Sequence, residues 1–246
     1  MMRGPGGAFA LVGFELAVGT FVLMWTTLLV WRVVDRGHYR AATWVLVPTE
    51  IAFSFALPGR IRGMGLTLAV LTALFLAAVY SRRPLLEWTS GALASAWGIG
   101  LLVAAGIRSC AGCAAGPIHA LLGAFVLGAV THGMTLGHWY LNQPRLPIEP
   151  LKAAIRILLT SIAFSLAAGL VTRPRLLAAS VEGVLVFSTS GFWWTWLLLI
   201  AGTGVLGGLI RSTVWSRSTQ SATGLLYIAM VTVLGGQFLL NLLLAS

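Results

Sequence analysis

The stretch from Ala8 to Val30 reads AFALVGFELAVGTFVLMWTTLLV, and Glu15 is its single charged side chain. About 20 consecutive apolar residues are enough for a helix to cross the hydrocarbon core of a bilayer. The stretch is also longer than the apolar core of a secretory signal peptide, which has about 7 to 15 residues. It therefore predicts a first membrane-spanning helix that is kept in the mature chain.

The composition extends this prediction to the whole chain. Of the 246 residues, 58% are hydrophobic and 9% are charged, and the mean hydropathy is +0.93. A soluble domain averages about 25% charged residues, and a disordered chain combines low hydrophobicity with high charge, so both classes are excluded. Apolar runs bounded by Arg, Pro and Gly predict an all-α, polytopic membrane helix bundle: a single transmembrane domain over residues 1–246, with short loops, embedded in the lipid bilayer. The eight predicted spans are roughly 8–31, 41–57, 63–80, 89–107, 117–141, 151–171, 190–210 and 222–244.

The net charge of +10 does not indicate nucleic acid as a partner. The basic residues lie in small groups between apolar runs, such as Arg82 with Arg83 and Arg173 with Arg175, rather than along one face. Such charges fix the topology of a membrane protein, because the cytoplasmic loops carry more Lys and Arg. With eight spans, ten basic residues fall on the side away from the termini and six on the side of the termini. This predicts that both termini lie outside a bacterial plasma membrane.

Ionisable side chains inside a span are costly and are candidates for function. Glu15 and His119 are expected at the same depth, where a carboxyl and an imidazole would serve the head group of a quinone and exchange its protons. The alternative is that Glu15 and His119 only satisfy each other, or that one of them binds Arg108.

Glu50 follows Pro48 in the second span, and proline frees a backbone carbonyl of a helix. A carboxylate beside such a break would carry protons or bind a cation. The alternative is a salt bridge with an Arg of a neighbouring chain. Glu15, Glu50 and His119 are therefore the predicted catalytic residues.

His132 is the candidate metal ligand, for the iron of a b-type haem. Gly128 lies one turn before it and Thr135 three residues after it, which predicts a groove where a flat macrocycle packs beside the imidazole. His138 is a further candidate cofactor-binding residue. In the alternative interpretation His132 bonds to a Thr or a carbonyl across a helix interface, and His138 is an interfacial residue beside the aromatic anchor Trp139.

Cys110 and Cys113 have the C-x-x-C spacing but lack the following His of a c-type haem attachment site, since Ala114 stands there. A structural disulfide, a pair of free thiols and a thiol–disulfide centre all fit this spacing.

No loop is long enough for a folded aqueous domain, so large water-side chemistry would come from other chains. These features predict an integral membrane subunit of a respiratory or photosynthetic-type electron-transfer complex. Its candidate cofactors are a quinone and a b-type haem, and its partners are the other subunits of the complex. Such a subunit is quinone-reacting or non-catalytic rather than an enzyme by itself. A small-solute or ion transporter, with Glu15 and Glu50 as coupling sites, and a non-catalytic scaffold or assembly subunit are the alternatives.

Overall fold

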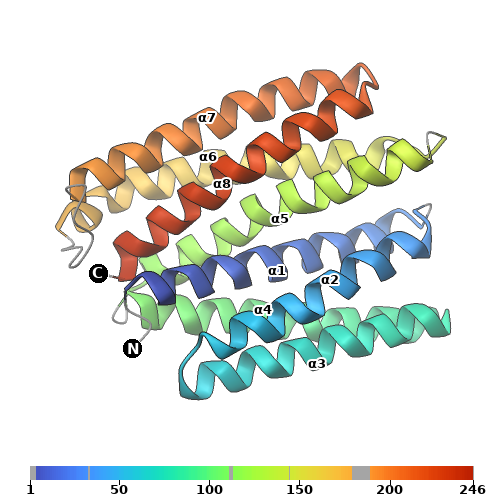
Figure 1. Cartoon of the computed structure of the whole chain (residues 1–246), viewed down its shortest axis with the longest axis horizontal. Coiled ribbons are helices and arrows are strands. Elements are labelled where there is room, and N and C mark those ends of the chain that lie inside the picture. Colours follow the sequence, from blue (N-terminus) through green and yellow to red (C-terminus); the bar gives the residue numbers. More distant parts are fainter. Residues whose placement is uncertain (1–3, 33, 111–112, 144, 179–188, 246) are drawn as a thin grey trace.

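The computed structural model describes residues 4–32, 34–110, 113–143, 145–178 and 189–245. Figure 1 shows eight long helices over these ranges, which form an all-helical membrane bundle. This confirms the predicted fold class. The helices are α1 (Pro5–Val30), α2 (Arg36–Phe55), α3 (Gly59–Ser81), α4 (Pro84–Ser109), α5 (Ala115–Asn142), α6 (Glu149–Ala178), α7 (Thr189–Trp215) and α8 (Thr219–Ala245).

Seven of these helices are long and apolar enough to cross a membrane, and α2 is the exception. Its 20 residues include the charged side chains Arg36, Arg40 and Glu50. A helix of this length still spans about 30 Å, and α2 packs beside α1 and α3 (Figure 1). It therefore completes the bundle although its own sequence is only moderately apolar.

The central elements of the bundle are α1 and α5, which pack against each other along most of their length. Helices α2, α3 and α4 lie on one side of this pair and α6, α7 and α8 on the other (Figure 1). Both central helices are lined with glycine where they touch: a Cβ on Gly19 would lie 1.8 Å from the carbonyl oxygen of Ala124. Small residues at this contact let the two backbones approach closely.

Successive helices run in opposite directions, so Pro5 and Ala245 lie at the same end of the bundle (Figure 1). We call this the termini end and the opposite one the basic end. The basic end holds the ten basic residues that the sequence places together: Arg32, Arg36, Arg40, Arg82, Arg83, Arg145, Lys152, Arg156, Arg211 and Arg217.

Four predicted boundaries differ from the helix ends by five residues or more. Helix α4 begins at Pro84 rather than near residue 89, and α7 ends at Trp215 rather than near residue 210. The other two belong to α2 and α6. Helix α2 begins at Arg36 rather than near residue 41, because the Asp35 side chain accepts a hydrogen bond from the backbone N–H of Gly37 at 2.6 Å and caps the helix. Helix α6 ends at Ala178 rather than near residue 171 and runs through Pro174. Residues 179–188, which follow α6 in the sequence, lie outside the described residues.

Candidate functional site

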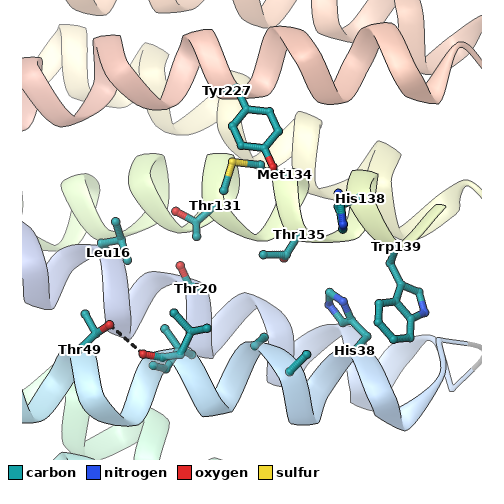
Figure 2. Close-up of a pocket in the computed structure, with 14 residues that line it drawn as sticks. Leu16, Thr20, His38, Thr49, Thr131, Met134, Thr135, His138, Trp139 and Tyr227 are labelled. Atoms are coloured by element: carbon teal, nitrogen blue, oxygen red, sulfur yellow. Dashed lines mark hydrogen bonds between the residues drawn. The ribbon is translucent and has the colours of Figure 1, made fainter. Parts of the chain in front are cut away.

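A pocket of about 420 Å³ lies where α2 diverges from α5, with α1 behind it and α8 at its side (Figure 2). Its opening is on the flank of the bundle, where Val45 and Tyr227 are 65% and 51% exposed. In a membrane protein this flank faces lipid. The lining residues are Leu16, Thr20, His38, Ala41, Ala42, Val45, Leu46, Thr49, Thr131, Met134, Thr135, His138, Trp139 and Tyr227.

His38 is a pocket residue that the sequence analysis missed. It lies in the first turn of α2, and its side chain is buried. Its ring contacts those of Tyr39, Trp139 and His132, with centroids 5.3, 5.7 and 5.8 Å apart. Its Nε2 atom has no hydrogen-bond partner among the described residues. A buried imidazole with a free nitrogen beside a pocket is available to a ligand.

Two of the predicted cofactor-binding residues, Thr135 and His138, also line the pocket. Figure 2 shows His138 of α5 opposite His38 of α2 at the end of the pocket nearest the basic end of the bundle. The hydroxyl of Thr135 donates to the carbonyl oxygen of His132 in its own helix, at 2.9 Å. The two imidazoles and the indole N–H of Trp139, which also lacks a partner among the described residues, are the polar groups at this end of the pocket.

The rest of the pocket is mostly apolar, and the exception is the buried hydroxyl of Thr20 in α1, which has no partner among the described residues. The hydroxyls of Thr49 and Thr131 donate to the carbonyl oxygens of Val45 and Leu127, one turn back in the same helix. From His38 to Thr49 the pocket follows α2 for about 16 Å at 1.5 Å per residue. It is thus a long apolar slot with histidines at one end.

The predicted groove beside His132 is filled by α1. A Cβ on Gly128 would lie 2.3 Å from the carbonyl carbon of Gly19, so the backbone of α1 lies directly against this face of α5. His132 is not a lining residue of the pocket. Its Nε2 atom is hydrogen-bonded to the hydroxyl of Thr27 at 2.8 Å, which is the alternative that the sequence left open.

Glu15 and His119 are both buried, but they bond to different helices. Glu15 accepts a hydrogen bond from the side-chain amide of Asn241 in α8, at 2.9 Å. The Nε2 atom of His119 is hydrogen-bonded to the hydroxyl of Thr172 in α6, also at 2.9 Å. Neither residue lines the pocket.

Glu50 is fully buried between α2 and α3 and accepts a hydrogen bond from the hydroxyl of Thr72 at 3.1 Å. It forms no ion pair with any described residue. The one ion pair of the described part of the chain joins Arg36 and Glu87, at 2.9 Å. Glu50 therefore lies apart from the pocket and from Glu15.

Cys110 and Cys113 are joined in a disulfide. The carbonyl oxygen of Cys110 accepts a hydrogen bond from the guanidinium of Arg175 in α6. The bridge thus ties the residue that follows α4 to one that lies two residues before α5, at the termini end and far from His38.

Among the described residues, no three His, Cys, Asp or Glu side chains lie close enough together to hold a metal ion. Comparisons with protein family models, with curated proteins and with solved structures found no match. The function of this membrane helix bundle therefore has to be inferred from its own residues.

Proposed function

We propose that this chain is a membrane subunit of an electron-transfer complex and that its pocket binds a lipid-soluble quinone. The observation that carries this proposal is the pocket itself: an apolar slot that opens on the flank of the bundle and has two imidazoles at one end. A prenylated quinone has the matching shape, since its head group accepts hydrogen bonds and its tail is hydrocarbon. The tail would follow α2 and α5 toward the middle of the membrane.

In this proposal the histidines act on the two oxygens of the head group. The free Nε2 atom of His38, when protonated, donates a hydrogen bond to one oxygen, and His138 serves the other. Reduction or oxidation of a quinone moves protons together with electrons, and an imidazole can hold or deliver one at each oxygen. His38 is buried and His138 is exposed, so His138 would exchange its proton with the surroundings.

The basic end of the bundle holds these histidines, and the excess of Arg and Lys there favours the cytoplasmic side of a bacterial plasma membrane. Protons for the head group would then come from the cytoplasm. The loops are too short to carry further redox centres, so partner subunits would supply or accept the electrons.

Binding of a short-tailed quinone such as decyl-ubiquinone or menadione to the purified protein tests this proposal. We expect His38→Gln to weaken binding about fivefold to tenfold, the value of about one hydrogen bond, and Ala42→Phe to block the slot. His119→Gln is the matched control, because His119 is a buried histidine of α5 outside the pocket. Equal loss in His38→Gln and His119→Gln, or no binding to the unaltered protein, would contradict the proposal.

A b-type haem is a second candidate for the same pocket. Two histidines on facing helices are the donor set that bis-histidine haem requires, whereas His132 already uses its Nε2 atom for Thr27. Haem would supply one-electron chemistry here, and His38 and His138 would hold it. The absorption spectrum distinguishes the candidates: a Soret band that is lost in His138→Ala and kept in His132→Ala favours haem, and a colourless protein that binds quinone favours the first proposal.

A further inference from the structure

A second polar cluster lies in the core of the bundle, away from the pocket. It consists of Glu15 of α1 with Gln237 and Asn241 of α8, and it faces Gly123 of α5. The three polar side chains are 0%, 1% and 1% exposed. We call it the Glu15 cluster. None of its residues lines the pocket, so it has no role in the function proposed above.

Three of the four side-chain oxygens of the Glu15 cluster have no hydrogen-bond partner among the described residues. The amide nitrogen of Asn241 donates to Oε1 of Glu15, which leaves Oδ1 of Asn241 without a partner. Oε2 of Glu15 and Oε1 of Gln237 also have no partner among the described residues. Unpartnered buried acceptors are rare in native proteins, and each of them calls for an explanation.

Two of these oxygens point to the same place. A Cβ on Gly123 would lie 2.7 Å from Oε2 of Glu15 and 2.7 Å from Oε1 of Gln237. A Cβ at these distances would clash, so both oxygens pack directly against a face of α5 that carries no side chain. Acceptor oxygens that converge in this way repel one another unless a hydrogen-bond donor or a cation lies between them.

No described basic side chain supplies that charge, because Arg36–Glu87 is the one ion pair in this part of the chain. A buried carboxylate without a counter-ion is very costly in a membrane interior. We infer that the Glu15 cluster binds a monovalent cation of the sodium type. The carboxylate of Glu15 and the amide oxygen of Gln237, which converge beside Gly123, are hard ligands of the kind that such a cation prefers, and a single positive charge neutralises the single carboxylate.

Glu50 shows why this inference is specific to Glu15. It is an equally buried carboxyl that accepts from the hydroxyl of Thr72, and its Oε2 atom also lacks a partner. The unpartnered buried amide oxygens of the described residues, on Gln237 and Asn241, belong to the Glu15 cluster instead. Glu50→Gln is therefore a matched control for Glu15→Gln, since both changes replace a buried carboxyl by an amide of the same size.

The test is the thermal unfolding of the purified full chain in sodium chloride and in choline chloride at equal ionic strength. A ligand that binds the folded state raises the unfolding temperature. We expect sodium to raise it by several degrees in the unaltered protein and in Glu50→Gln, and to have no effect in Glu15→Gln. Gln237→Met, which removes one oxygen at nearly constant volume, should reduce the sodium response and keep the fold.

Equilibrium binding of radioactive sodium to the unaltered protein gives an independent reading that needs no variant. One saturable site per chain supports the inference. Absence of saturable binding, or a sodium response that survives in Glu15→Gln, overturns it. In that case the Glu15 cluster would be a structural contact in which the carboxyl is held by the two amides of α8. Quinone binding at the pocket would be unaffected by either outcome.

Discussion

The contact between α1 and α5 makes a quantitative prediction about Gly128. An alanine there would place its Cβ 2.3 Å from the carbonyl carbon of Gly19 and 2.6 Å from its oxygen, whereas ordinary van der Waals contact begins at 3.4 Å. The obstacle is backbone and has no rotamer that could relieve the clash. The two central helices would have to separate by about 1 Å, and overpacking of this kind costs about 1 to 3 kcal/mol.

Gly133 of the same helix is the matched control. A Cβ at Gly133 meets the Leu226 side chain at 3.5 Å and the Ala154 Cβ at 3.9 Å, which is ordinary contact. Both changes gain the same helix propensity, about 1 kcal/mol, so this contribution cancels in the comparison. We therefore expect Gly128→Ala to be less stable than Gly133→Ala by about 1 to 3 kcal/mol.

The assay is reversible unfolding of each variant in mixed micelles, with increasing fractions of a denaturing detergent. The free energy of unfolding is compared between the variants at the same detergent composition. If Gly128→Ala proved as stable as Gly133→Ala, the close packing of α1 on α5 would be refuted, and with it the statement that α1 fills the groove beside His132.

Three further predictions concern other contacts. Arg36→Gln leaves the buried carboxylate of Glu87 without its ion pair, and we expect the free energy of unfolding to fall by about 1 to 3 kcal/mol in the same assay. The additional change Glu87→Gln should restore part of this loss, because it removes the unpaired charge. Gly169→Ala places a Cβ 2.0 Å from the ring of Trp196, so its melting temperature should fall below that of Gly208→Ala, whose Cβ meets open space; equal melting temperatures would count against the contact between α6 and α7. Reduction of the Cys110–Cys113 disulfide should lower the free energy of unfolding by at most about 2 kcal/mol, because the bridge closes a very short loop. A larger loss would contradict this reasoning and would mean that the disulfide also maintains packing contacts between α4 and α5.

The fold could be predicted from the sequence because the free energy of transfer to lipid is a property of each segment by itself. A run such as Ala8 to Val30 has to be helical and buried in lipid or protein, whatever its neighbours are. The boundaries of α2 were harder, since Arg36, His38 and Arg40 lower its hydropathy. Asp35, a capping residue directly before Arg36, was the signal that would have placed His38 in a helix.

The site could be predicted only in part. Thr135 and His138 were chosen from residues near His132 on one helix, and they line the pocket. The partner of His132 could not be predicted, because nothing in the sequence tells which helix covers the face of α5 that carries Gly128. The same holds for Glu15: its depth followed from the hydropathy of α1, while its bond to Asn241 depends on how α8 packs.

The bond between Glu15 and Asn241 joins residues that are 226 positions apart, in the first and the last helix of the bundle. During synthesis α1 enters the membrane long before α8 is made, so its carboxyl group waits without the amide that will hold it. The hydrogen bond of Glu15 can therefore form only after α8 has entered the membrane, and the packing of α1 is completed by a helix made much later.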